Sequence, residues 1–330
     1  MFFPEFTITQ KILKNIGFIE YYRAIVDNTV ILQNWEAQLR KEAKIDFIRS
    51  VLLAEKINIP DETIKRTIDN IEQNKSGEIV NLDKTYDMLE EISRSKELDE
   101  MDIKYMHKSI SQNLLPKTRQ GVYRSTKVSG KTEPESILAD IVELFDWFNS
   151  LDAKENHPVV AASILKARLE EIMPFENFNS ATIDTTVHLA LKISGYTFKD
   201  YVVITGYYQK TQRELERGLA SISHESPDYT EWIEYFSEGM ALQVSSTQEK
   251  VKTLAKDTKI AKASGRYKLT ERQEKIIEFI QNYGMLQNKD FQRLFPNISE
   301  DSVLRDLKVL IERDIIEKAG STKSSRYELK

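Results

Sequence analysis

Apolar residues recur at intervals of three or four positions along most of this 330-residue chain, which is the spacing of amphipathic helices. The run from Ile8 to Leu53 has no lasting interruption and predicts two or three helices. The same spacing predicts further helices at 80–93, 99–113, 134–150, 157–172, 180–194, 198–221 and 229–246. Because only 11 Gly and 8 Pro are present to break them, we expect a mostly α-helical fold.

The amino-acid composition excludes several kinds of site. There is no cysteine, so disulfides, thiolate nucleophiles and cysteine-ligated zinc are excluded. The four histidines, His107, His157, His188 and His224, are isolated and lack metal-ligand spacing, so we predict no metal site. The net charge of −5 argues against a chain that binds polyanions over its whole surface, but it allows a local basic face.

The N-terminus and the hydropathy pattern bear on location. The segment "MFFPEFTITQK" has no basic stretch ahead of an apolar one, and no 18 apolar residues run together. We therefore expect neither export nor a membrane partner, and we predict a cytoplasmic protein.

Changes in composition divide the chain into four regions. We expect an N-terminal helical region at 1–75, a central helical domain at 76–247, a basic linker at 248–268 and a C-terminal domain at 269–330. The linker is predicted because "QEKVKTLAKDTKIAKASGRYK" is rich in lysine and poor in large apolar residues, although part of it suits a helix.

The C-terminal region has the pattern of a winged helix-turn-helix domain. Thr270 and Ser299 are candidate N-caps, and Gly284 and Pro296 are placed to end the first two helices. The last segment alternates like a two-stranded wing. Three short helices followed by a hairpin predict a winged helix.

Several residues of this region are candidates for contact with DNA. The third predicted helix buries one apolar side, and three of its residues are left for a major groove: Ser302, Arg305 and Lys308. Two residues near the wing tip suit backbone phosphates: Lys323 and Arg326. The triplet at 305–307 resembles recognition helices of bacterial winged-helix repressors. Acidic residues at 300, 301 and 306 partly cancel the charge, so a role in protein contacts alone is the alternative.

One interruption of the helical pattern raises a question about function. Between "HPVVAASILKARLEE" and "SATIDTTVHLALKIS" stand Met173 to Asn179, with a proline, two phenylalanines and two asparagines. A second helix that begins at Asn179 or Ser180 would present free backbone N–H groups, which can hold a phosphate. A plain turn held by Phe175 is the other interpretation, and the residues alone leave both open.

A second irregular segment precedes it. Gly121 and Gly130 flank the alternating "VYRSTKV", which favours a short β-hairpin or an exposed edge strand over a helix.

Residues 157–196 resemble the core of the Fic family, whose active loop reads His-Pro-Phe-x-Asp/Glu-Gly-Asn-Gly-Arg-x-x-Arg between two helices. The stretch "MHKSISQNLLPKTRQGVYRS" is similar to the family's sequence before and through its target-positioning flap, and "YTEWIEYFSEGMALQV" is similar to a later helix. A winged helix is a frequent companion of the family. Together these similarities cover most of 80–330 and imply that 76–247 is a Fic-like domain.

The resemblance implies that such a loop transfers AMP from ATP to a protein hydroxyl with the help of Mg²⁺. Met173 stands where the family has its general-base histidine, and Asn177 stands at the metal-binding carboxylate. Pro174, Phe175 and Asn179 are kept, whereas Phe178 and Ser180 replace glycines and Ala181 and Asp184 replace arginines.

These replacements predict that the ordinary Fic reaction is absent. A thioether takes no proton, and a positioned general base accelerates a reaction by about 10²–10⁴. Loss of cationic donors removes about another 10²–10³, and a carboxylate at Asp184 repels a triphosphate. We therefore assign no catalytic residue and no metal site, and we treat ATP and Mg²⁺ only as candidate ligands. The remaining nucleotide loop consists of Phe175, Glu176, Asn177, Asn179 and Ser180.

The resemblance also implies a flap and an inhibitory helix. The flap residues are Tyr123, Arg124, Ser125, Thr126 and Lys127. In "SVLLAEKIN", Glu55 falls about where many Fic proteins carry an inhibitory glutamate, but with Asp184 opposite we expect no ion pair and a helix kept for packing. We also expect His157 and His188 to be structural.

The sequence therefore predicts a mostly α-helical, Fic-like protein with a small β-hairpin flap and a C-terminal winged helix. We expect a regulator that binds DNA, with a homodimer as one option because two half-sites add affinity. The alternatives are a nucleotidyl or phosphoryl transferase with altered chemistry, and an interaction module whose flap edge pairs with a partner protein's strand.

Overall fold

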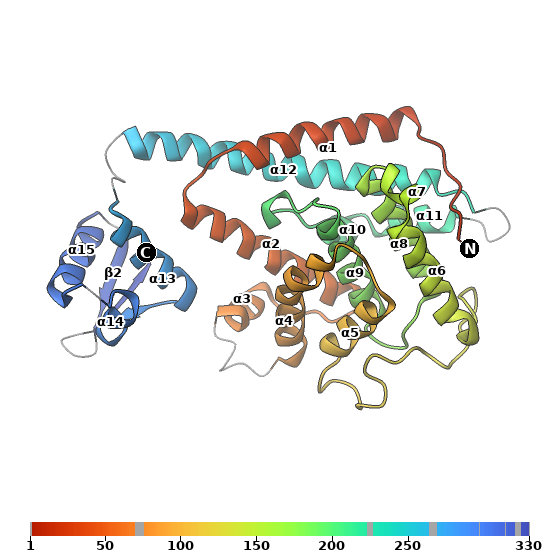
Figure 1. The fold of residues 1–330 in the computed structure, drawn as a ribbon, viewed down its shortest axis with the longest axis horizontal. Coiled ribbons are helices and arrows are strands. Elements are labelled where there is room, and N and C mark those ends of the chain that lie inside the picture. Colours follow the sequence, from red (N-terminus) through yellow and green to blue (C-terminus); the bar gives the residue numbers. More distant parts are fainter. Residues whose placement is uncertain are drawn as a thin grey trace. The chain divides into compact units, whose positions relative to one another are not determined.

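The computed structural model describes residues 2–69, 76–222, 227–263, 269–296, 298–313, 315–320 and 325–329. It divides into two compact units, one formed by 1–28 and 40–249 and the other by 29–39 and 250–330 (Figure 1). The predicted mostly helical fold with a small sheet is confirmed. The finer division into four regions stays a prediction.

The first unit is built from helices, and its described residues contain no strand. The helices are α1 (Gln10–Asn28), α2 (Gln33–Ala54), α3 (Asp61–Asp69), α4 (Gly77–Ile92), α5 (Glu100–Ile110), α6 (Ile137–Asn149), α7 (Leu151–Glu155), α8 (Pro158–Ile172), α9 (Asn179–Ile193), α10 (Thr205–Lys210), α11 (Gln212–Ala220) and α12 (Thr230–Ala263). Single 3₁₀ turns lie at Ser93–Ser95, Pro134–Ser136 and Phe198–Asp200. The expected helical regions are thus found. Helix α12 continues into the predicted linker, whose residues 264–268 lie outside the described part.

Helices α8 and α9 form the centre of the first unit. Both are buried on nearly every side, and α9 packs against α4, α5 and α8. A helix can be buried all round only if small and apolar residues cover its whole circumference, as the alanines, valines and isoleucines of α8 do. The two helices therefore hold the loop between them, 173–178, on a rigid base.

The two histidines expected to be structural are so. The ring of His188 lies 5.4 Å from that of Phe47 and 5.2 Å from that of Tyr86. His157 is the N-cap of α8, because its Nδ1 accepts a hydrogen bond of 3.3 Å from the backbone N–H of Val159.

The prediction of a hairpin at 121–130 is wrong. This segment forms no strand, and the small sheet lies at 286–329 instead. The reason is Arg124, whose buried guanidinium bonds to four backbone carbonyls. One of these carbonyls, that of Thr126, belongs to the segment, and those of Ile172 and Met173 belong to the end of α8. The guanidinium therefore fastens the segment to α8 instead of leaving it to pair with itself.

Besides the first residues of α2 and the last residues of α12, the described part of the second unit contains three helices and the sheet. They are α13 (Glu271–Tyr283), β1 (Leu286–Gln287), the turn Asn288–Asp290, α14 (Phe291–Leu294), α15 (Glu300–Glu312), β2 (Ile316–Ala319) and β3 (Arg326–Leu329). The strands are antiparallel in the order β1-β3-β2, with Leu286 opposite Tyr327 and Ile316 opposite Leu329.

A separate apolar core holds the second unit together. It joins Ile276 and Ile280 of α13 to Val303, Leu307 and Leu310 of α15, so the predicted buried side of the third helix is confirmed. Thr270 caps α13 through a capping box with Gln273, and Gly284 ends that helix with φ +77°. The predicted N-cap at Thr270 and the predicted helix end at Gly284 are thus confirmed.

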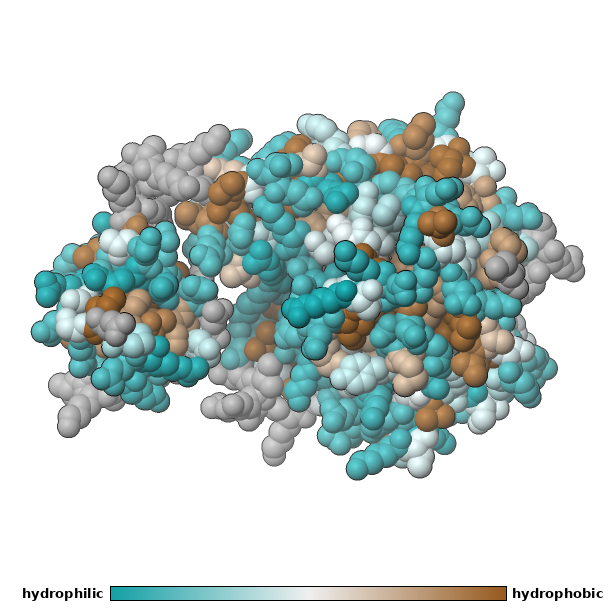
Figure 2. Space-filling model, viewed as in Figure 1, coloured by the Kyte–Doolittle hydropathy of each residue, from teal (hydrophilic) through white to brown (hydrophobic). Residues whose placement is uncertain are grey.

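The surface is largely polar. Figure 2 shows hydrophilic residues over most of the visible face, with smaller apolar areas between them. None of the described helices combines the length and the low polarity that a membrane span requires.

Candidate functional site: the corner between helices α8 and α9

The backbone of the corner turns through two left-handed residues. Met173 ends α8 with φ 48°, and Phe178 precedes α9 with φ 52°. Residues other than glycine rarely adopt this conformation, and each case costs about 1–2 kcal/mol. Phe178 stands where the resemblance predicts a glycine, so the backbone shape of a glycine loop is kept although the glycine is not.

The loop is fastened from within by two of the residues predicted to line it. The backbone N–H of Phe175 donates to Oδ1 of Asn179 at 3.1 Å, and the Phe175 side chain is completely buried. Its ring stacks on the imidazole of His107, with 3.9 Å between centroids and 4° between planes. The corner is therefore a rigid structure rather than an open loop.

His107 comes close to the loop but is not a substitute for the missing histidine. Its Nδ1 accepts from the backbone N–H of Gly121 at 2.8 Å, and its Nε2 lies 3.1 Å from the carbonyl oxygen of Asn177. These contacts use both nitrogens of a neutral ring, and burial lowers the pKa of His107 to about 4. The imidazole is thus a spacer between α5, the flap and the loop. The burial of His107 could have been predicted from the sequence, because it lies on the apolar side of α5 with Ile103, Met106 and Ile110.

The N-terminus of α9 is already in contact with a carboxylate of the chain. Oε1 of Glu55, the residue directly after α2, accepts a hydrogen bond of 2.8 Å from the backbone N–H of Ala181. Burial raises the pKa of Glu55, and the nearby carboxylate of Asp184 acts in the same direction, while the backbone donors oppose both. The positive end of the helix is thus satisfied internally. Glu55 does more than the packing role expected of its helix.

Asp184 does not face an open cleft. It is 5% exposed, and its Oδ1 lies 2.7 Å from Nζ of Lys166, which is also 3.0 Å from Oε1 of Glu170. Burial alone would lower the pKa of Lys166, but the two carboxylates outweigh it and raise the pKa. The expected repulsion by Asp184 is therefore partly neutralised, and Lys166 is fully engaged by its two partners. Sequence reasoning missed Lys166, because its partner is 18 residues away.

Comparison with solved structures identifies the fold. No protein-family model matches the sequence, and no curated protein is similar to it. Among solved structures, a Fic family protein from Desulfovibrio desulfuricans G20 superimposes with a TM-score of 0.63 at 19% identity, covering 100% of this chain and 98% of that one. Fic-1 from C. elegans gives 0.60 at 16% identity with 74% of each chain covered. A Fic domain containing signaling protein from Bacteroides thetaiotaomicron VPI-5482 gives 0.57 at 17%, covering 74% of this chain and 98% of that one.

The chain has a Fic fold. At these identities the similarity concerns the fold alone. The contacts described above lie in the loop between α8 and α9 of this fold.

The predicted flap of the Fic-like unit does meet the loop. Oγ1 of Thr126 donates to Oε1 of Glu176 at 3.0 Å, and the Tyr123 ring lies 5.4 Å from that of Phe175. The hydroxyl of Tyr123 donates to Glu100, and Lys127 pairs with Glu133 at 2.6 Å. The segment that the resemblance identifies as the flap is therefore a neighbour of the loop in the structure.

Arg124 is the strongest link between flap and loop. Its Nε donates to the carbonyl of Met173 at 2.7 Å, and its terminal nitrogens donate to the carbonyls of Ile172, Thr126 and Thr132. Its backbone N–H donates to the carbonyl of Pro174 at 2.9 Å. With 3% of its surface exposed, Arg124 is a structural residue rather than one that positions a target.

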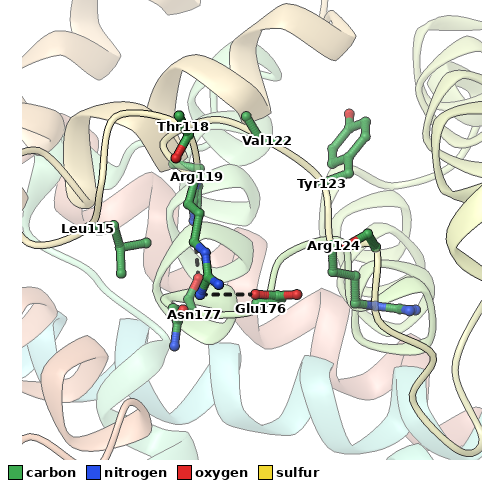
Figure 3. A pocket seen from close by; sticks show the side chains of 10 residues that line it. Leu115, Thr118, Arg119, Val122, Tyr123, Arg124, Glu176 and Asn177 are labelled. Atoms are coloured by element: carbon green, nitrogen blue, oxygen red, sulfur yellow. Dashed lines mark hydrogen bonds and ion pairs between the residues drawn. The ribbon is translucent and has the colours of Figure 1, made fainter.

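A small cavity of about 160 Å³ separates the two segments. In Figure 3 the Arg119 side chain points across it toward Glu176, and the two are 3.5 Å apart. The floor and rim are formed by His107, Leu115, Thr118, Arg119, Val122, Tyr123, Arg124, Ser125, Glu176 and Asn177.

The corner does not fit ATP and Mg²⁺ in the manner of an active Fic protein. Glu176 is engaged by Arg119 and Thr126, and the described residues contain no cluster of three His, Asp or Glu side chains that could hold a metal ion. The N–H of Ala181 is bound to Glu55, and Lys166 is bound to two carboxylates. Ser180 is the second residue of α9, and its backbone N–H is a further donor to the carboxylate of Glu55.

The predicted DNA-contact residues lie in the second unit. Arg305 and Lys308 are exposed on α15, and Ser302 is half-buried with its hydroxyl 2.9 Å from that of Ser299. Arg326 on β3 pairs with Glu328 at 2.8 Å, and Lys323 lies outside the described residues. Asp306 is turned inward, where its carboxylate accepts from Nε of Arg272 at 2.7 Å and from Nε2 of Gln273 at 3.1 Å.

Proposed function

We propose that this Fic-like chain is a regulator that binds DNA through its second unit and that its Fic corner transfers no nucleotide. The observation that carries the proposal is on α15: Arg305 and Lys308 point outward, while Asp306 is buried against Arg272. The acidic residue in the middle of the helix therefore does not weaken the outward positive charge.

The arrangement of the second unit supports a winged helix. Helices α13, α14 and α15 and the antiparallel order β1-β3-β2 are consistent with the sequence of elements in that domain. In this proposal α15 is the recognition helix. Ser302, Arg305 and Lys308 are three residues apart in turn, so they share one side of the helix. An arginine fork fits the edge of guanine, and Lys308 and Arg326 suit phosphates.

The loss of transfer is supported by three features of the corner. Met173 offers no proton acceptor, Glu55 occupies a backbone donor of α9, and Lys166 is neutralised by its partners. His107 has no free nitrogen to act in place of Met173. Without base and cations, the rate would fall by about 10⁴ or more.

A salt series of DNA-binding measurements tests the proposal. The full chain, titrated with genomic fragments in a filter-binding assay, should bind more weakly as salt rises, with a linear dependence on log[salt]. Arg305→Ala should lower affinity for the preferred sequence about 5- to 150-fold, and Lys308→Ala should reduce the salt slope by about one. Arg213→Ala, an exposed arginine on α11, is the matched control and should change neither. Absence of binding at low salt would refute the proposal.

The second candidate is transferase activity with altered chemistry, favoured by the left-handed Phe178 that keeps the shape of a glycine loop. Incubation with labelled ATP and Mg²⁺ tests it. Label on the chain or on a lysate protein would support this candidate, and we expect none.

Sedimentation of the DNA complex tests the proposed homodimer, because it gives the number of chains bound at each DNA site.

A further inference from the structure

A second cleft in the first unit takes no part in the corner described above. Its volume is about 660 Å³, in the range of sites for small molecules. It lies among α1, α10, α11 and the first turns of α12; α1 runs beside α12 here, with Nδ2 of Asn15 3.0 Å from Oγ of Ser237 (Figure 1). The lining residues are Lys11, Tyr207, Thr211, Glu214, Arg217, Gly218, Glu231, Glu234, Tyr235 and Glu238.

Two tyrosines form an aromatic wall of the cleft. The rings of Tyr207 and Tyr235 lie 5.3 Å apart, and the Tyr235 hydroxyl is 2.8 Å from Oγ1 of Thr211. A Cβ at Gly239 would lie only 2.3 Å from the Tyr207 ring. Glycine is unfavourable inside a helix relative to alanine. Its presence at 239 lets the Tyr207 ring lie close against α12.

Carboxylates follow the cleft along one side of α12. Glu231, Glu234 and Glu238 are three and four residues apart, so they are separated by about 4.5 and 6 Å along the helix axis. Glu214 lies across from them on α11. Within the described residues no three of these groups come close enough to hold a metal ion. Lys11 and Arg217 also line the cleft, but they offset only part of the charge of the four carboxylates. The remaining negative charge, spread along the cleft, suits a longer cation that carries several charges.

An ammonium group of the chain already lies in the cleft. Nζ of Lys11 is 2.9 Å from Glu238 and 4.0 Å from Glu234, and its side chain is 48% exposed. An exposed pair of this kind contributes little to stability, so an incoming amine can replace it. Lys11 thus shows which chemical group the carboxylates accept.

We propose that this cleft binds a linear aliphatic polyamine, with its ammonium groups on Glu231, Glu234 and Glu238 and its alkyl chain along Tyr207 and Tyr235. Aromatic faces attract cations and also cover methylene groups, so the two kinds of wall act on the same ligand. The cleft would make the chain responsive to a small cation, independently of whether the second unit binds DNA.

Calorimetric titration of the full chain with spermidine at low salt tests this proposal. Wild-type protein should bind one spermidine with a saturable heat. Glu231→Gln and Tyr207→Leu should each weaken binding about twofold to fivefold. Lys11→Ala should tighten it by a similar factor, because a competing ammonium is removed. Glu155→Gln, an exposed glutamate on α7, is the control and should leave the affinity unchanged.

The outcomes separate the site from general charge attraction. No saturable heat, or equal weakening by Glu155→Gln and Glu231→Gln, would overturn the proposal. Binding of Mg²⁺ as tight as that of spermidine would also overturn it, because the cleft would then select its ligand by charge alone. The opposite directions expected for Lys11→Ala and Glu231→Gln cannot both arise from loss of folding.

Discussion

The carboxylate of Glu55 accepts a hydrogen bond of 2.8 Å from the backbone N–H of Ala181, 126 residues away in the chain. The contact joins the end of α2 to the first turn of α9, at the place where a Fic loop presents backbone donors to a phosphate. Since one oxygen of Glu55 occupies this place, a side chain of the chain itself satisfies the backbone donor. Glu55 therefore contributes a specific hydrogen bond in addition to the packing of its helix.

Replacement of Glu55 separates its charge from its hydrogen bond. Glu55→Ala should lower the free energy of unfolding of the first unit by about 1 kcal/mol, because a helix loses its N-terminal acceptor. Glu55→Gln keeps an acceptor oxygen and removes a buried charge whose pKa is raised, so we expect no loss of stability at pH 7. Urea unfolding followed by circular dichroism measures both. A larger loss for Glu55→Gln than for Glu55→Ala would contradict this assignment.

The buried pair of Lys166 and Asp184 should behave differently when one or both partners are changed. Lys166→Met leaves a buried carboxylate without its cation and should cost about 3–5 kcal/mol. Lys166→Met combined with Asp184→Leu should recover most of that loss, because both charges are gone. Lys41→Met, which breaks the exposed pair with Asp69, is the control and should cost less than about 1 kcal/mol. A double variant no more stable than Lys166→Met would show that Asp184 has a further partner.

The neutral ring of His107 makes stability depend on pH. Its pKa in the folded chain is about 4, below the value of about 6.5 expected when unfolded. The stability from the buried neutral ring is therefore complete above about pH 6.5 and is lost as the pH falls toward 4. By pH 4 the loss reaches about 3 kcal/mol. His107→Gln should remove this part of the pH dependence in urea unfolding series, and an NMR titration of the ring with a midpoint above pH 6 would contradict the burial argument.

Sequence reasoning found most of the helices because their apolar spacing is regular and their ends are marked. Thr270, Gly284 and the buried side of α15 are examples, since capping and periodicity act over a few residues. The Fic fold was found from a resemblance around residues 157–196, although the loop itself differs at most of its functional positions.

What the sequence did not predict depends on contacts between distant residues. Lys166 looked like an ordinary polar position on a helix, and only the fold brings it to Asp184. Arg124 looked like part of a hairpin, but its guanidinium donates to carbonyls at the end of α8, up to 49 residues away. Such contacts leave no local periodicity or spacing in the sequence.

A pair of substitutions on α15 tests the inward position of Asp306, and with it the basis of the proposed DNA contact. Asp301 and Asp306 carry the same charge on the same helix, but Asp301 is exposed whereas Asp306 is bound to Arg272 and Gln273. Asp301→Asn removes a negative charge next to Arg305 and should raise DNA affinity about twofold to fivefold. Asp306→Asn should not raise it. Instead it should destabilise the second unit by about 1–3 kcal/mol, because the buried contact with Arg272 loses its charge. Hydrogen exchange of α13 and α15 amides measures that loss without DNA. If Asp306→Asn increased DNA affinity as much as Asp301→Asn and left amide exchange unchanged, Asp306 would face the DNA, and α15 would present a mixed charge rather than a basic one.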